Sequence, residues 1–245
     1  LAAGLTHARA DVLLAIAPAA VRAARKATTS MPIVAMDLET DPVKTGLVSS
    51  LARPGGNVTG IFFDAPEVAG KWMQMLREVV PALQRLALLW DPSTGLAQIE
   101  AAENAARSLK IATHRLEVRK PADLISAVRM AADLRAGALL VLSSPIFAGE
   151  APQIASLALQ HRLPSITLFP VFARSGGLLS YGPDNLDLLR QAGALVGKVL
   201  RGAAPATLPI ERPTRFRLLV NVKTAKAFDL AIPQALLVQA DQLIQ

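Results

Sequence analysis

The chain alternates short apolar runs with longer segments in which apolar residues recur at helical spacing. Most runs are continuous rather than alternating with polar residues, as in parallel strands that are covered on both faces. They predict strands at residues 11–16, 31–36, 58–63, 85–90, 111–118, 137–142, 165–169, 176–181 and 216–221. Between them, helices are predicted at residues 19–28, 42–52, 67–79, 96–109, 121–135, 150–161, 184–201 and 223–228. This order is typical of parallel βαβ units, so the pattern predicts an α/β fold.

Nine strands are many for a single sheet, and two extended connectors, near residues 57–66 and 202–213, look like crossings between lobes. Two similar α/β lobes therefore account for the pattern better than one wide sheet does. A cleft between the lobes follows from that arrangement, and it is where we expect a ligand to bind.

Composition narrows the class of protein. Of the 245 residues, 52% are hydrophobic and 18% are charged, which excludes a disordered chain, and the absence of Cys excludes a disulfide-stapled one. The absence of Cys also fits an exported protein. No apolar run approaches the roughly 18 residues that a membrane-spanning helix needs.

The chain has 26 Lys and Arg against 19 Asp and Glu, a formal net charge of +7. The basic residues are spread in small groups, such as Arg22, Arg25 and Lys26, and the chain contains no zinc-finger or other nucleic-acid motif. A solvated basic surface explains this charge better than a nucleic-acid groove, which needs a concentrated basic stripe. We therefore expect no nucleic-acid partner.

In open parallel α/β sheets, ligands bind at the carboxyl ends of the strands, so the residues directly after each apolar run are the candidate site. Ala17, Pro18 and Ala19 follow the first predicted strand. Pro18 starts a helix there, and the free N–H groups and dipole of a helix N-terminus favour a carboxylate or another anion.

Polar side chains follow other predicted strands. Asp41 lies at the predicted N-cap of the second helix, and Asp91 opens the loop after the fourth strand. A helix or turn cap explains each of them, contact with a ligand ammonium explains them equally, and the two roles are compatible. Ser143 and Ser144 open the loop after the sixth strand. Tyr181, the only tyrosine, is either a core or hinge aromatic or a ring that lies over the ligand.

Catalytic chemistry has little support in the sequence. His7, His114 and His161 are widely separated and lack metal-site spacing, and there is no Cys. The chain also lacks a GxSxG elbow, a GxxxxGKS/T phosphate loop and a GxGxxG motif after a strand. We expect a binding protein with no catalytic residue, no bound metal and no cofactor.

Three segments together carry a resemblance to a known family: MPIVAMDLETDPVKTGLVSSLARPGGNVTG at residues 31–60, GGLLSYGPD at 176–184 and PTRFRLLVNVKTAKAFDLAIP at 213–233. With them the chain resembles the substrate-binding proteins of bacterial ABC transporters, and more narrowly the group that includes tryptophan and aromatic amino-acid binding proteins. The resemblance covers essentially all 245 residues, and the combination is far more specific than any one of its pieces.

The resemblance implies a type I periplasmic-binding-protein fold, the Venus flytrap architecture, in which two Rossmann-like lobes of parallel sheet flanked by helices are joined by three crossings. The first lobe would comprise residues 1–60 and 183–204 and the second residues 61–182 and 205–245, with hinge crossings near 57–66, 180–184 and 202–213. Relatives carry a signal or lipoprotein segment and further elements before the point that matches Leu1. We expect that stretch to be removed or disordered here, and the strand at 11–16 to be edge-like as a result.

The same resemblance implies roles for most of the candidate residues. Pro18 and Ala19 would cap the ligand from the first lobe, and Asp41 would be its acidic contact. Asp91 and Ser143 would lie in loops of the second lobe, and Tyr181 near the hinge.

Three positions depart from the pattern of the relatives. Ala17 stands where they usually have Thr, Asp91 where Asn is common, and Ser144 where Asp is common. The solute therefore need not be one of the family's known amino acids.

The expected function is that of the extracytoplasmic solute-binding component of an ABC importer, in the periplasm or lipid-anchored outside the cytoplasmic membrane. It would bind a small metabolite between its lobes, an amino acid and preferably an aromatic one, and deliver it to a membrane permease. Asp41 would hold the amine, the helix N-terminus at residues 18–20 the carboxylate, and Tyr181 the apolar body. The alternatives are the ligand-sensing core of a transcription regulator, which shares the fold, and a sugar or nucleotide enzyme. We expect a monomer, with a dimer as the alternative.

Overall fold

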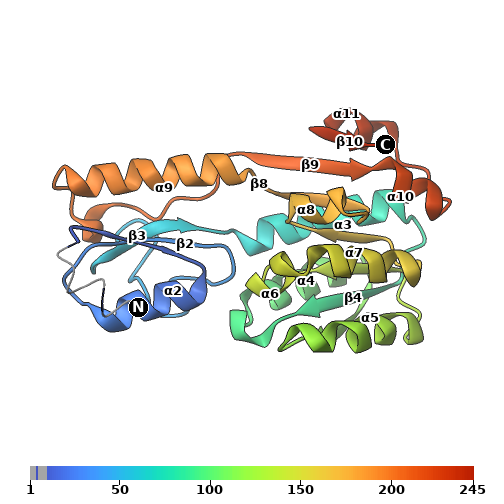
Figure 1. Cartoon of the computed structure of the whole chain (residues 1–245), viewed down its shortest axis with the longest axis horizontal. Coiled ribbons are helices and arrows are strands. Elements are labelled where there is room, and N and C mark those ends of the chain that lie inside the picture. Colours follow the sequence, from blue (N-terminus) through green and yellow to red (C-terminus); the bar gives the residue numbers. More distant parts are fainter. Residues whose placement is uncertain (1–3, 5–9) are drawn as a thin grey trace. The chain divides into compact units, whose positions relative to one another are not determined.

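The computed structural model describes residue 4 and residues 10–245, and these fall into two compact units. One unit comprises the chain up to Asp64 together with Pro183–Arg215, and the other comprises Ala65–Gly182 together with Phe216–Gln245 (Figure 1). The described strands form two separate sheets rather than one wide sheet, as the strand count predicts.

The first unit is built on a parallel sheet whose described strands are β1 (Leu13–Ile16), β2 (Ile33–Asp37) and β3 (Val58–Phe62), in that order. Successive residues of β2 face opposite sides, so Ile33 and Ala35 pack with α2 (Pro18–Ala27) while Val34 packs with α9 (Asn185–Leu200). Figure 1 shows α9 lying along β2 and β3. β1 is an edge strand of the described sheet, as expected for residues 11–16.

The segment 205–215 belongs to the first unit and not, as the predicted boundary had it, to the second. It begins with a 3₁₀ turn, η3 (Pro205–Thr207). Beyond this turn, Ile210 N donates to Leu51 O at 2.8 Å and Glu211 N donates to Gly60 O at 2.8 Å. The second bond ties the segment to β3 and the first ties it to the loop that precedes β3, and apolar periodicity alone reveals neither.

The predicted helix at residues 42–52 is wrong, because the structure has turns there. Leu47 N and Val48 N both donate to Pro42 O, and Gly46 has a φ of 68°, in the left-handed region that ends a helical path. The apolar spacing of Val48 and its neighbours still has a physical origin, since Val48 is buried against the face that α2 covers.

The second unit contains a seven-stranded sheet in the order β10-β9-β8-β7-β6-β4-β5. Its strands are β4 (Arg85–Trp90), β5 (Ala112–Glu117), β6 (Ala138–Val141), β7 (Ser165–Thr167), β8 (Leu179–Pro183), β9 (Phe216–Asn221) and β10 (Gln242–Ile244). The pairs β4–β5, β4–β6, β6–β7, β7–β8 and β9–β10 are parallel. β10 is the one described strand of this sheet that the apolar pattern does not predict, since it has only three residues.

Helices surround this sheet. They are α3 (Ala65–Val79), α4 (Ala97–Ser108), α5 (Leu124–Asp133), α6 (Pro145–Gly149), α7 (Ala151–Gln160), α8 (Pro170–Arg174), α10 (Val222–Ala227) and α11 (Gln234–Gln239), with 3₁₀ turns η1 (Pro92–Thr94) and η2 (Pro121–Asp123). The short helices α6, α8 and α11 were not predicted, because one or two turns give too little periodicity to recognise.

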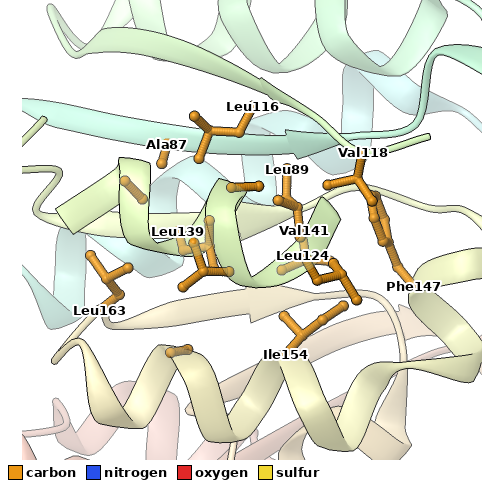
Figure 2. Close-up of a cluster of buried hydrophobic side chains, with 14 of the residues drawn as sticks. Ala87, Leu89, Leu116, Val118, Leu124, Leu139, Val141, Phe147, Ile154 and Leu163 are labelled. Atoms are coloured by element: carbon orange, nitrogen blue, oxygen red, sulfur yellow. The ribbon is translucent and has the colours of Figure 1, made fainter. Parts of the chain in front are cut away.

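Core packing fixes where the strands of the second unit end. Leu89 of β4 and Val141 of β6 lie in one buried cluster with Leu124 of α5 and Ile154 of α7 (Figure 2). Phe147 of α6 is also fully buried in this cluster, directly after the loop that leaves β6. The loop after β6 is therefore anchored at both ends, by Val141 and Phe147, which holds its polar side chains in place.

Candidate ligand-binding site

The chain turns sharply from β1 into α2 at Ala17. This residue has a φ of 72° and a ψ of 156°, a combination that Gly adopts freely and that costs other residues about 1–3 kcal/mol. Its N–H donates to Met36 O at 2.9 Å, which holds the turn against β2. No side chain caps α2, and the N–H groups of Ala19 and Ala20 have no acceptor among the described residues. With buried Pro18 at its first position, this helix end can bind a carboxylate.

Asp37, at the end of β2, directly follows an apolar run, but it was not assigned a ligand-binding role. Its side chain is only 1% exposed, and one oxygen accepts from Glu39 N and Thr40 N, both at 2.9 Å. The other oxygen accepts from Thr40 Oγ1 at 2.6 Å. Both carboxylate oxygens are thus occupied, so Asp37 shapes the loop after β2.

Asp41 lies in the same loop and is half-buried. Its Oδ1 accepts from Val43 N at 2.9 Å and from Lys44 N at 3.0 Å, so it caps a turn instead of the predicted helix. Its second oxygen has no hydrogen-bond partner among the described residues and can accept from a ligand.

In the second unit, the structure brings Asp91, Ser143 and Ser144 together, because β4 and β6 are neighbours in the sheet. Asp91 is 2% exposed; its Oδ1 accepts from Ser93 N at 2.9 Å and its Oδ2 accepts from Ser144 Oγ at 2.6 Å. Ser144 Oγ in turn accepts from Ile146 N at 3.1 Å. Each oxygen of Asp91 thus accepts a hydrogen bond from the protein, and the bond with Ser144 joins the two loops.

Sequence reasoning missed Gln98, which fixes the second of these loops. Its side-chain oxygen accepts from Ser143 N at 2.8 Å, and its nitrogen donates to Ser143 O at 3.1 Å. Gln98 is 2% exposed on the face of α4 that also buries Ile99 and Ala102. A polar residue on the apolar face of a predicted helix was the available signal.

Tyr181 lies on β8 and is half-buried. Its ring stacks on Phe216 with centroids 5.5 Å apart and an angle of 21° between the planes, and its backbone oxygen accepts from Trp72 Nε1 at 2.8 Å. Burial, with a smaller contribution from the negative charge of Glu67, raises the pKa of the Tyr181 phenol. These contacts fit a hinge aromatic, and a role against the ligand stays a prediction.

The prediction that the protein binds no metal rests on the wide separation of His7, His114 and His161 in the sequence. His7 lies outside the described residues. Within residue 4 and residues 10–245, no three His, Asp or Glu side chains gather as a metal site would require. In the same part of the chain, no helix is both long and apolar enough to cross a membrane.

Residues 2–244 match the family described as ABC transporter substrate binding protein. The chain belongs to this family. The resemblance that three sequence segments carry is thereby confirmed.

Individual relatives agree with this assignment. A tyrosine-binding protein of Clostridioides difficile (strain R20291) is 28% identical over 225 residues, which are 90% of this chain and 63% of that protein. A crystal structure of the ABC domain in complex with L-Trp from Streptococcus pneumoniae has a TM-score of 0.92 at 25% identity, over 99% of this chain and 82% of that one. The chain thus spans 63% of the length of its curated relative.

A third relative bears on the fold alone. The ligand-free, open structure of a substrate-binding protein from Clostridium difficile has a TM-score of 0.72 at 20% identity, over 100% of this chain and 81% of that one. Together with the parallel sheets, these likenesses confirm the predicted type I periplasmic-binding fold.

Proposed function

We propose that this protein is the extracytoplasmic receptor of an ABC importer and that it binds a free aromatic amino acid, tyrosine or tryptophan, between its two units. Family membership supports the transport role, and the ligands named for two relatives support the solute class. The observation that carries the proposal is the end of β1, where strained Ala17 leads into the uncapped N-terminus of α2.

Each part of the solute has a proposed partner. Its carboxylate accepts from Ala19 N and Ala20 N, where the helix dipole favours negative charge. Its ammonium donates to the second oxygen of Asp41, and its ring packs against Tyr181. In this proposal Asp91 supports the loops after β4 and β6 through its bonds with Ser93 and Ser144 and does not contact the solute.

Binding would then favour the closed arrangement of the units. A solute that contacts both units only when they close shifts the population toward closure by the free energy of the added contacts. The closed form would deliver the solute to a membrane permease.

Calorimetric titration with a set of related ligands tests the solute class. L-Tyrosine or L-tryptophan should bind saturably, whereas tyramine, which lacks the carboxylate, and 3-(4-hydroxyphenyl)propionate, which lacks the ammonium, should bind about tenfold or more weakly. Equal affinity for the amino acid and tyramine would remove the role of α2. Failure of both L-tyrosine and L-tryptophan to bind saturably would refute the proposal.

A matched pair of variants tests the ammonium contact. Asp41→Asn keeps the oxygen that caps the turn but removes the charge, and it should weaken amino-acid binding about tenfold or more. Asp123→Asn is the control, since Asp123 also caps backbone N–H groups, those of Arg119 and Lys120. Equal affinities of the two variants would rule out Asp41 as the ammonium contact.

A further inference from the structure

α2 carries three cations on one side of the helix. Arg22, Arg25 and Lys26 follow the i, i+3 and i+4 spacing that places side chains next to one another, and all three are exposed. None of them forms an ion pair with a described acidic residue. The proposed amino-acid site uses none of these three charges.

The same three side chains line a pocket of about 240 Å³ within the first unit, between α2 and the segment 37–47. Val21 and Leu47 also line it, so its wall is partly apolar. A concave space differs from the solvated basic surface that the sequence suggested, because its walls bring several cations close to one bound group.

Asp37 also lines this pocket, and its negative charge needs explanation in a site for anions. The carboxylate accepts three hydrogen bonds, from Glu39 N, Thr40 N and Thr40 Oγ1, so these donors already compensate it. No cation of α2 lies within ion-pair distance of Asp37, so this acid does not account for the basic cluster.

Helix stability explains only part of the pattern. Arg25 and Lys26 lie in the last turn of α2, where a cation interacts favourably with the helix dipole. Arg22 lies a turn earlier, where that effect has faded, and the dipole does not require a pocket beside the cations.

We propose that this pocket binds a multiply charged anionic group of the phosphate type. A guanidinium group can bind two oxygens of one phosphate at the same time. The three positive charges of two arginines and a lysine suit an anionic group with two or more negative charges. At about 240 Å³ the pocket is smaller than the roughly 300–1,000 Å³ of sites for drug-sized ligands, so it fits a phosphate or diphosphate group rather than a whole nucleotide. The group belongs either to a free anion or to the headgroup of an anionic lipid.

The test uses two probes. Inorganic pyrophosphate, titrated by calorimetry, represents the free anion, and co-sedimentation with vesicles of phosphatidylglycerol, against vesicles of phosphatidylcholine, represents the headgroup. The basic-pocket variant combines Arg22→Gln, Arg25→Gln and Lys26→Gln. For any probe that the unaltered protein binds, the affinity of this variant should be about tenfold or more lower. Added salt should weaken the binding further.

The charge-control variant combines Arg53→Gln, Arg190→Gln and Arg201→Gln, which remove the same charge from exposed positions of the same unit. It should keep most of the binding, and both variants should bind the amino acid as the unaltered protein does. Equal losses in the two variants, or binding of neither probe by the unaltered protein, would overturn the proposal. A failure of amino-acid binding in the unaltered protein would instead count against the proposed transport function.

Discussion

Replacing Ser144 with Ala should destabilise the second unit, because the Ser144 hydroxyl joins the loops after β4 and β6. Ser144 Oγ donates to Asp91 Oδ2 at 2.6 Å and accepts from Ile146 N at 3.1 Å. The variant removes both bonds at once. Since Asp91 is 2% exposed and Ser144 is fully buried, bulk water cannot replace the missing hydroxyl.

The magnitude follows from the two bonds. A hydrogen bond to an ionised group is worth about 1.5–3 kcal/mol, and a side-chain cap at a helix start about 1 kcal/mol. The free energy of unfolding should therefore fall by about 2–4 kcal/mol, a large share of the roughly 5–15 kcal/mol that stabilises a typical protein.

Urea unfolding followed by far-UV circular dichroism measures this loss, with Ser165→Ala as the matched control. Ser165 is 1% exposed in the same unit, but its hydroxyl has no hydrogen-bond partner among the described residues. Its removal should leave stability within about 0.5 kcal/mol or raise it slightly. In an Asp91→Asn background, Ser144→Ala should cost less, because no charged oxygen is left without a donor.

Equal losses for Ser144→Ala and Ser165→Ala would refute the reasoning. So would a Ser144→Ala variant that loses amino-acid affinity while keeping full stability, since this would make Asp91 and Ser144 ligand contacts rather than loop supports.

Three further predictions concern the backbone and the single tyrosine. Ala17→Gly should relieve the strain at φ 72° and raise the free energy of unfolding by about 1 kcal/mol in urea unfolding, without weakening amino-acid binding. Gly60→Ala should greatly reduce the yield of folded protein in expression trials, because the added Cβ would lie 2.0 Å from Ala35 O across the β2–β3 pair. Spectrophotometric titration of Tyr181 should give a phenol pKa above its ordinary value of 10.0, and Glu67→Gln should bring it part of the way back. Since folding favours the neutral phenol, the stability that this group contributes is complete below the ordinary pKa and is lost as pH rises through the raised value.

Apolar runs predicted the strands well because buried parallel strands carry a strong, local signal. Residues 42–52 show where that signal misleads. Val48 is apolar because it packs into the core, yet the segment that carries it is not a helix. Segment 205–215 shows a second limit. Backbone hydrogen bonds such as Glu211 N to Gly60 O attach it to β3, and the pattern of side chains does not predict such bonds.

Position in the sequence selected the candidate residues, but it did not predict their hydrogen bonds. Asp37, Asp41 and Asp91 follow strands in similar contexts, and the sequence does not distinguish them. The number of donors around each carboxylate does. Asp37 and Asp91 have both oxygens occupied, whereas Asp41 has one oxygen without a described partner. The number of donors around a carboxylate depends on which loops meet in the folded chain, and no single segment of the sequence shows that.

The hydrogen bonds of Asp91 and Ser144 also bear on two positions that were expected to differ from the relatives. Asp91 stands where Asn is common and Ser144 where Asp is common, which suggested a different solute. In the structure these two side chains bind each other, with Ser144 as donor and Asp91 as acceptor. An Asn at 91 and an Asp at 144 would place a donor and an acceptor at the same two points with the roles exchanged. Asp91 and Ser144 thus have a structural role in this chain, so their presence does not by itself indicate a solute outside the aromatic amino acids.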